Sequence, residues 1–274
     1  MSLKNLSNSL KSKPTQTPEE ALGIKIDTRV RNLSAVNLLE VKIPLDYVEK
    51  INNHIDNVII PQNEDYSGSL VGQINRDKKS AQLGFPLDTE FGKEFKKLLD
   101  VCGTTFLQNA YKRESAADAF QCWTVHSFAG DYNVFHSHST MTMPGLSCIL
   151  FLKIPDGVLT DTQITHDRFK LQDATGHCDG WTQFIWGSNT KEDIFCLKPQ
   201  QQEFCIPSVG KMVMFPKWLH HQVYPFFSDS ERRTLSANFN IRDSENEKFK
   251  YMSSTEKKHY LEQRNKKQQS NDNT

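Results

Sequence analysis

The sequence lacks the features that mark a membrane, secreted or nucleic-acid-binding protein. No apolar run approaches ~18 residues, the length that a transmembrane helix needs, and the first residues lack the apolar segment of a secretory signal. Basic and acidic residues balance, 33 against 33, so no overall field favours nucleic acid or an anionic membrane. We therefore expect a cytoplasmic protein with neither a membrane nor a nucleic acid as its partner.

The six cysteines form neither a CxxC pair nor the regular spacing of a disulfide framework. In a chain of 274 residues without a secretory signal, we expect them to be reduced thiols. A reducing compartment also suits an oxidisable metal such as Fe(II).

Composition and periodicity divide the chain into three parts. Residues 1–30 are rich in Ser, Asn, Lys, Thr and Pro, which predicts a flexible arm. Residues 251–274 form a polar tail that we expect to begin as a short helix and to end disordered. Between them, residues 31–250 are expected to form one domain, helical over 40–115 and β over 120–245.

The periodicity of the apolar residues changes once within this domain. Residues 44–57 and 88–113 carry apolar side chains at three- and four-residue steps, which predicts two amphipathic helices. After residue 120, about eight short runs rich in β-branched and aromatic residues predict strands. Helices followed by short strands favour an antiparallel barrel or sandwich buttressed by N-terminal helices. Residues 156–180 lack alternation and are predicted to form a long loop inserted between two strands.

Two histidines, His136 and His138, stand one residue apart just before an apolar run. Residues two apart in a strand point to the same face, so their imidazoles project side by side as two ligands of one cation. His220 and His221, on a later predicted strand, offer a third ligand. Imidazole suits Fe(II), Zn and Cu. The alternative is an exposed strand edge or a hydrogen-bonded pair without a metal.

Six stretches between Trp123 and Ile241 resemble one family when they are taken in order. They are WTVHSFAGDYNVFHSH, LSCILFLKIP, WTQFIWGS, IPSVGKMVMFP, WLHHQVYPF and ERRTLSANFN. Together they are similar to the 2-oxoglutarate/Fe(II)-dependent oxygenases, in particular the prolyl-hydroxylase-like proteins of bacteriophages and marine bacteria. The resemblance implies a mainly β fold with N-terminal helices, namely a double-stranded β-helix of the jelly-roll or cupin-like barrel type. It also implies a cytoplasm that is bacterial, or that of the host if the chain is phage-encoded.

The same resemblance implies the site residues and the cofactors. His136, His138 and His221 are expected to bind Fe(II), with His138 where the family usually has Asp or Glu. 2-Oxoglutarate is the implied cosubstrate, together with O2, and its far carboxylate is expected on Arg232 and Thr234. A guanidinium offers a planar fork to a carboxylate, and a hydroxyl on the same strand face adds a bond. No catalytic residue beyond the metal ligands is implied.

Strand alternation places the neighbours of these residues. His220 and Arg233 are expected to point away from the site, whereas Asn238 is expected on the same face as Arg232. Four aromatic residues are candidates for the cavity wall, although aromatic residues at strand spacing are more often plain core: Trp123, Phe151, Phe184 and Trp186.

Two other HxD strings compete for the metal. His54 and Asp56 fall in a predicted helix, where residues two apart diverge. His177 and Asp179 offer a carboxylate, but they lie at the end of the predicted insertion rather than before the strand that follows the family's motif. We therefore prefer His136 and His138, with Asp179 as the open alternative.

Two other functions stay open. Three-histidine iron sites are familiar in cupin-type dioxygenases, and Gly130 begins a G-x5-H-x-H pattern that resembles the opening of a cupin motif. The Glu that this motif expects does not follow. The alternatives are thus a cupin-like dioxygenase or isomerase that does not use 2-oxoglutarate, and a catalytically inactive barrel. The substrate is expected to be a protein or peptide side chain, with a nucleotide or another small molecule as the alternative.

Overall fold

The structure is a computed structural model, and it describes residues 36–62, 64–72, 81–138, 144–160, 178–189 and 196–271. The elements below belong to the unit Asn37–Thr274. The predicted arm, residues 1–30, lies outside the described residues, as does most of the predicted insertion (161–177). The predicted domain limits, 31–250, therefore stay a prediction. No helix in the described part of the chain is long and apolar enough to cross a membrane.

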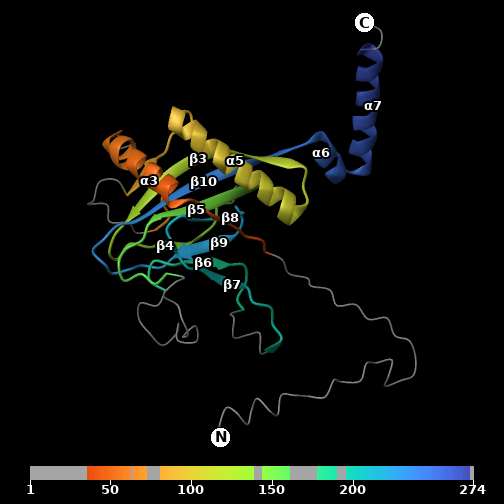
Figure 1. Ribbon diagram of the computed structural model, residues 1–274. Coiled ribbons are helices and arrows are strands. Elements are labelled where there is room, and N and C mark those ends of the chain that lie inside the picture. Colours follow the sequence, from red (N-terminus) through yellow and green to blue (C-terminus); the bar gives the residue numbers. More distant parts are fainter. Residues whose placement is uncertain are drawn as a thin grey trace, which may run out of the picture. The chain divides into compact units, whose positions relative to one another are not determined.

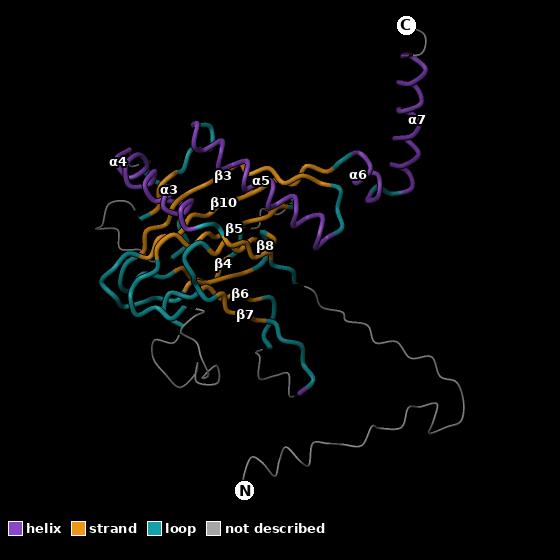
Figure 2. Tube along the Cα trace, in the orientation of Figure 1, coloured by secondary structure: helices purple, strands orange, loops and turns teal. Residues whose placement is uncertain are grey.

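Two antiparallel sheets form the body of this unit (Figures 1 and 2). The larger sheet has six strands in the order β1-β8-β5-β10-β3-β2. The smaller sheet has four strands in the order β4-β9-β6-β7. The strands of the larger sheet are β1 (Leu39–Lys42), β2 (Gln82–Gly84), β3 (Ser115–Ser127), β5 (Gly145–Lys153), β8 (Lys211–Pro216) and β10 (Arg232–Asp243); those of the smaller are β4 (Asn133–His136), β6 (Thr182–Ile185), β7 (Gln202–Cys205) and β9 (His220–Val223).

This arrangement confirms the predicted fold class with one correction. The chain is mainly β, and helices between residues 45 and 111 precede eight of the ten strands described. Within the described residues, however, no pair of strands joins the two sheets, so they do not close into a barrel. The sheets instead face each other as two layers.

The helices cover the face of the large sheet that points away from the small one (Figure 1). They are α3 (Leu45–His54), which continues through a π-helical turn η1 (Ile55–Ile59) into α4 (Ile60–Gln62), and α5 (Glu90–Tyr111). Both predicted amphipathic helices are therefore present, and the apolar stripe of α5 (Phe95, Leu99 and Phe106) is buried in the main core. Thr89 begins α5, because its hydroxyl accepts a hydrogen bond from the Gly92 amide at 3.0 Å.

The helical region predicted over 40–115 needs a correction, because it contains two strands. β1 pairs with β8 and β2 pairs with β3, so both lie at edges of the large sheet. Each has only three or four residues, too few for a two-residue period to stand out in the sequence. A 3-10 turn, η2 (Ser67–Ser69), precedes β2.

The C-terminal tail is more helical than predicted. After α6 (Glu245–Tyr251), helix α7 (Ser254–Asn271) extends through most of the predicted tail. The three last residues lie outside the described part of the chain, so the predicted disorder at the end stays a prediction.

Alternation along β10 determines where a functional site can form. Leu235, Ala237 and Phe239 are buried in the core beneath the helices. The residues between them therefore face the small sheet, and Thr234, Ser236 and Asn238 line a cavity between the layers.

Close packing of α5 on β3 leads to a stability prediction at Gly103. A Cβ at this buried position would lie 2.5 Å from the Cβ of Ala117, too close for the two elements to keep their spacing. Gly103→Ala should therefore lower the free energy of unfolding by about 1 kcal/mol, because overpacking outweighs the helix propensity gained. Urea unfolding measures this, and the exposed helix variant Thr105→Ala is the control, which should be neutral or slightly stabilising. A Gly103→Ala protein as stable as the parent would contradict the packing described.

Candidate metal centre and its cavity

Three histidines converge between the two sheets. His136 ends β4 and is paired in register with His221 on β9, and the His138 amide donates a hydrogen bond to the Lys217 carbonyl at 3.0 Å. One ligand atom from each of the three residues lies within 4.8 Å of the other two. Among the described residues, this is the one group of three or more His, Cys, Asp or Glu side chains that could hold a metal ion. The structure thus brings together the three histidines that the sequence analysis selected.

Hydrogen bonds fix how each imidazole is presented. The Nδ1 atoms of His136 and His221 donate to the carbonyls of Val134 and Leu219, at 2.6 and 3.1 Å. A carbonyl only accepts, so these Nδ1 atoms carry the protons and each Nε2 keeps a lone pair. Such bonds are the usual way in which a protein sets the tautomer and orientation of a metal-binding histidine.

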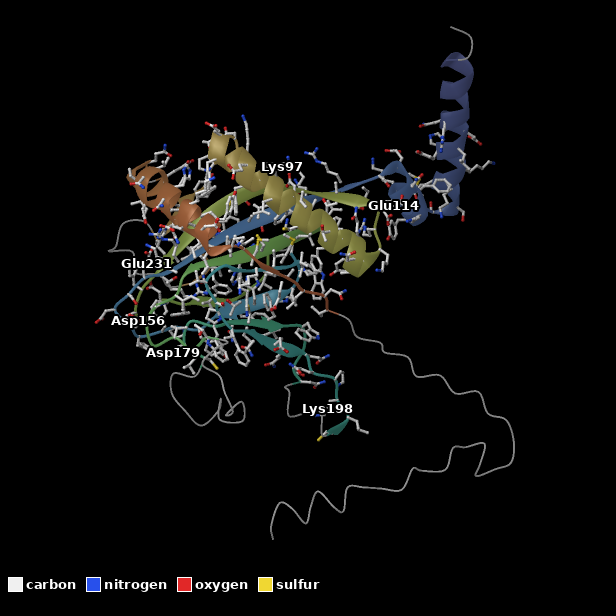
Figure 3. The ribbon with its side chains drawn as sticks, in the orientation of Figure 1. Lys97, Glu114, Asp156, Asp179, Lys198 and Glu231 are labelled. Atoms are coloured by element: carbon white, nitrogen blue, oxygen red, sulfur yellow. The ribbon has the colours of Figure 1, made fainter. Side chains whose placement is uncertain are left out.

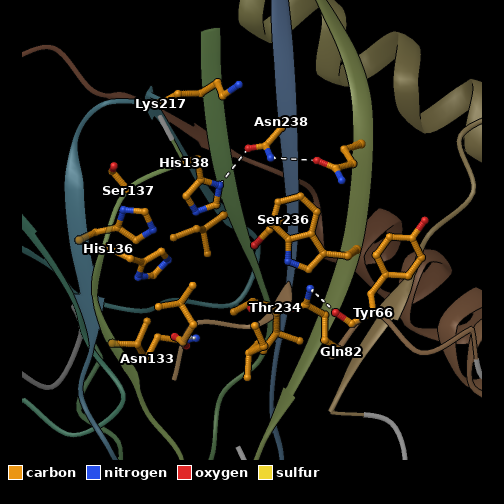
Figure 4. Close-up of a pocket in the computed structure, with 18 of the residues that line it drawn as sticks. Tyr66, Gln82, Asn133, His136, Ser137, His138, Lys217, Thr234, Ser236 and Asn238 are labelled. Atoms are coloured by element: carbon orange, nitrogen blue, oxygen red, sulfur yellow. Dashed lines mark hydrogen bonds between the residues drawn. The ribbon is translucent and has the colours of Figure 1, made fainter. Parts of the chain in front are cut away.

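His138 is oriented by a side-chain pair instead. Its Nδ1 lies 3.0 Å from Oδ1 of Asn238, and the Ser147 hydroxyl donates to the same oxygen at 2.8 Å. The Trp123 ring stacks on the imidazole of His138, with ring centroids 5.9 Å apart. Figure 4 shows the His138–Asn238 hydrogen bond and the two imidazoles of His136 and His138 side by side. Asn238 therefore lies where alternation predicted it, beside the site.

Burial lowers the pKa of all three imidazoles, which favours their neutral form. Burial lowers the pKa of His138 to about 4, with a further contribution from the nearby His136. Burial, followed by the charges of His136 and His138, lowers the pKa of His221 well below its ordinary value. Neutral imidazoles are the form that binds a metal, so the donor set fits a divalent cation such as Fe(II).

A cavity of about 370 Å³ opens beside the histidines (Figure 4). Its wall is formed by strands of both sheets and by the segment before β2. No Asp or Glu is among the described residues that line it: Tyr66, Leu70, Val71, Gln82, Phe120, Gln121, Trp123, Val125, Asn133, His136, Ser137, His138, Ile149, Lys217, His221, Val223, Arg232, Thr234, Ser236 and Asn238.

Arg232 is a buried cation in this cavity. Its Nε donates to the Gly180 carbonyl at 3.0 Å, and its guanidinium lies 5.4 Å from the centre of the Phe151 ring. Its Nη2 is buried and has no hydrogen-bond partner among the described residues. Burial lowers the pKa of Arg232 to about 10, so the group is still a cation near neutral pH. A buried guanidinium with an unused donor fits an anionic ligand, and Thr234 lies two residues along the same strand face.

The sequence analysis did not identify a second buried polar group without a hydrogen-bond partner. The hydroxyl of Thr182 on β6 is buried without a hydrogen-bond partner in the described part of the chain. Thr182 pairs in register with Cys205, whose thiol is close enough to influence Arg232. A threonine within an apolar strand gives no signal in the sequence that separates it from core.

An ion-pair network holds the start of β10 from the face of the large sheet that points away from the cavity. Glu231 accepts hydrogen bonds from Nδ1 of His126 at 2.6 Å and from Nε of Arg233 at 2.9 Å. Arg233 also donates to Asp56 at 2.6 Å, and Lys153 to Glu231 at 3.1 Å. Glu231 lies at the opposite end of the large sheet from Glu114 (Figure 3). The network fixes the backbone immediately next to Arg232.

This network also accounts for one competing motif. Asp56 is engaged by Arg233, and the His54 ring packs against Phe85 and Phe91 in the helical layer. Neither residue belongs to the histidine cluster. His177 of the other motif lies outside the described residues, and Asp179 is partly buried in a turn and also outside that cluster.

The remaining expectations have mixed outcomes. His220 is exposed and stacks on Phe135, with ring centroids 4.6 Å apart, so it points away from the cluster. Of the four aromatic candidates for the cavity wall, Trp123 lines the cavity, whereas Phe151, Phe184 and Trp186 do not. Phe151 and Phe184 are fully buried and lie against Arg232 and His221 respectively.

Comparison with protein families gives one match. Residues 121–238 match the model of a family described as "Putative 2OG-Fe(II) oxygenase", and they include the three histidines, Arg232, Thr234 and Asn238. No protein with curated annotation matches the chain.

Solved structures are similar to this chain at low sequence identity. EctD from S. alaskensis in its apoform has a TM-score of 0.50 and 12% identity, covering 75% of this chain and 73% of that one. A Pseudomonas putida prolyl-4-hydroxylase has a TM-score of 0.45 and 12% identity, covering 76% and 94%. HygX from Streptomyces hygroscopicus, with nickel and 2-oxoglutarate bound, has a TM-score of 0.45 and 10% identity, covering 75% and 83%. The likeness to EctD supports the two-sheet fold.

The Glu231 network predicts how stability depends on pH. Burial alone would raise the pKa of Glu231, but hydrogen bonds from His126 and Arg233 outweigh it and lower this pKa far below its ordinary value. The network therefore stabilises the fold above the pKa of an unfolded Glu, about 4.3, and its contribution is lost as the pH falls below that value. Glu231→Gln should lower the free energy of unfolding at pH 7 by roughly 2 kcal/mol. Its urea-unfolding free energy should then decline less than the parent's between about pH 5 and pH 3.

The exposed strand variant Glu40→Gln is the control for loss of a carboxylate. Parallel pH profiles for Glu231→Gln and the parent would contradict the assigned role of the network.

Proposed function

Because residues 121–238 match the model of a 2OG-Fe(II) oxygenase family, we propose that His136, His138 and His221 hold the Fe(II) and that Arg232 and Thr234 bind 2-oxoglutarate. The chain is a 2-oxoglutarate-dependent oxygenase in this view, with a histidine in place of the usual carboxylate ligand. One observation carries the assignment. Three neutral imidazoles, each with Nδ1 engaged in a hydrogen bond, converge in the cavity that also contains a buried arginine with an unused donor.

Bound Fe(II) would supply the redox chemistry that uses O2 and 2-oxoglutarate to hydroxylate a substrate. The residues of the chain would supply position and charge. Asn238 and Ser147 hold the ring of His138, and the backbone carbonyls of Val134 on β4 and of Leu219 just before β9 hold the other two rings. Three neutral ligands leave the site with the full charge of the cation, one unit more positive than a site with a carboxylate. Such a site should hold an anionic cosubstrate strongly.

Arg232 would orient the cosubstrate from the other end. Its position is over-determined by the bond to Gly180, the ring of Phe151 and the adjacent Glu231 network. A rigid, buried guanidinium loses little entropy when it binds a carboxylate, which makes it suited to positioning.

The substrate and the location complete the proposal. The family resemblance supports a protein or peptide side chain as substrate, and the cavity wall offers both aromatic rings (Tyr66, Phe120) and amides (Gln82, Gln121) to receive one. We place the reaction in the cytoplasm, of a bacterium or of a phage's host. The cysteines, which are present as thiols, support this location.

The metal assignment can be tested with two adjacent histidines. His221→Ala should weaken anaerobic Fe(II) binding on the order of a hundredfold, since loss of a second-shell partner alone typically costs ten- to a hundredfold. His220→Ala should bind Fe(II) like the parent, because His220 is exposed and stacked on Phe135. Competition with a chromophoric chelator measures both constants. If Asp179→Asn abolishes binding while His138→Ala does not, the competing HxD motif supplies the ligands instead.

The cosubstrate assignment can be tested at Arg232. In the parent, 2-oxoglutarate added anaerobically to the Fe(II) form should produce the visible metal-to-ligand charge-transfer band. Arg232→Gln should weaken 2-oxoglutarate binding at least about tenfold, the worth of a charged hydrogen bond, while Fe(II) affinity is retained. Metal binding without any band in the parent would point to a cupin-like dioxygenase. No metal binding at all would point to an inactive fold.

A further inference from the structure

Lys217 lines the cavity, and its aliphatic stem is buried. It directly follows β8, and only 7% of its surface is exposed. Its aliphatic stem passes over Gly145 on β5, where a Cβ would lie only 2.4 Å from the Lys217 Cδ. The absence of a side chain at Gly145 thus lets the lysine cross the strand and reach the cavity.

The ammonium group of Lys217 has no counter-charge among the residues that the structure describes. No carboxylate, hydroxyl or carbonyl in the described part of the chain accepts a hydrogen bond from it, and its recorded contact is with the ring of Phe120, 5.6 Å from Nζ to the centroid. The aliphatic stem is the buried part, whereas the ammonium itself keeps access to water, as a lysine that lies along apolar surface usually does. A cation in the cavity wall that no acid of the described lining neutralises is free to bind an anionic ligand.

A β-bulge places Phe120 beneath this ammonium. Asn238 of β10 pairs with Gln121, whereas Phe239 pairs with Ala119, so Phe120 is an extra residue in β3. Phe120 and Gln121 consequently both line the cavity, although neighbours in a regular strand point to opposite faces. Phe120 is 47% exposed, so its ring offers apolar surface at the opening.

The two cations of the cavity lie too far apart to serve one small ligand. Lys217 crosses Gly145, which pairs with Asn240 near the far end of β10, whereas Arg232 begins the strand. Seven or eight residues of strand separate the two levels, roughly 20 Å or more at about 3.3 Å per residue. Figure 4 shows the same order, with Lys217 beyond Asn238 and Thr234 at the other end of the view. A five-carbon dicarboxylate on Arg232 cannot reach Lys217.

We propose that Lys217 and Phe120 form a subsite for an oxyanion, carboxylate or phosphate, that the oxygenase substrate carries next to an apolar group. That the bound molecule is a substrate rests on the proposed function. The binding of an anion at Lys217 does not. The absence of Asp and Glu from the described lining residues agrees with it, since a basic substrate would meet only repulsion there. The metal cluster lies next to the subsite through the His138 amide, which donates to the Lys217 carbonyl.

Matched probes test the subsite in the full-length chain. The probes are 3-phenylpropionate, its neutral amide 3-phenylpropionamide, and 2-phenylethyl phosphate, titrated calorimetrically with 2-oxoglutarate in excess so that Arg232 is occupied. The parent should bind at least one of the two anions about tenfold more tightly than the amide, the worth of a charged hydrogen bond. The stronger of the two anions identifies which oxyanion the subsite takes.

Lys217→Met keeps the length of the stem and should abolish the preference, leaving amide binding within about twofold of the parent. Lys217→Arg should keep the preference, as should Lys97→Met, which removes an exposed lysine from α5. Lys217→Gln serves as a second neutral variant if thermal unfolding shows that Lys217→Met does not fold.

Two results would overturn the inference. One is a parent that binds anions and amide equally. The other is an anion preference that survives in the neutral Lys217 variants. If Arg232→Gln then removes this preference, the anion binds at Arg232 and the inference is also overturned. The proposed function fails separately: without a 2-oxoglutarate-dependent band, a Lys217-dependent anion preference would still establish the subsite.

Discussion

The alternation of side chains along β10 is the constraint on which the rest of the structure depends. One face of this strand is buried against the helices through Leu235, Ala237 and Phe239. The other face presents Arg232, Thr234, Ser236 and Asn238 to the cavity. Because β10 lies between β5 and β3 in the large sheet, its register is fixed on both sides. Any shift by one residue would exchange the core face with the binding face, so folding and function select the same register.

The polar groups of the cavity are held by groups behind them rather than by one another. Backbone carbonyls and Asn238 take one nitrogen of each histidine, and the Gly180 carbonyl takes one donor of Arg232. What remains free are lone pairs on the histidines and a donor on the arginine. A site organised in this way has little reorganisation left to do when ligands bind, which is the usual origin of strong preorganisation.

Much of this could be predicted from the sequence because local periodicity survives in it. The two helices, most of the long strands and the faces of Arg232 and Asn238 follow from steps of two and of three to four residues. The convergence of His136 and His138 with His221 needed the family resemblance, since nothing local relates residues 83 positions apart. Asp56 shows the opposite case: a surface-like acid in a predicted helix is bound by Arg233, 177 positions away. Lys217 likewise looks like an ordinary surface lysine, and only the tertiary fold buries its stem and places it in the cavity wall.

The β-bulge at Phe120 has a consequence for how β3 carries its pattern. Before the bulge, the odd-numbered Ala117 and Ala119 are buried beneath the helices; after it, the even-numbered Cys122 takes over that role. The residues that face the core therefore change from odd-numbered to even-numbered at the bulge. A prediction from the sequence that assumes a constant two-residue period assigns the wrong face to one half of the strand. The register shift is confined to this one position of the strand pair. The core below keeps its composition, while the cavity above gains one additional side chain.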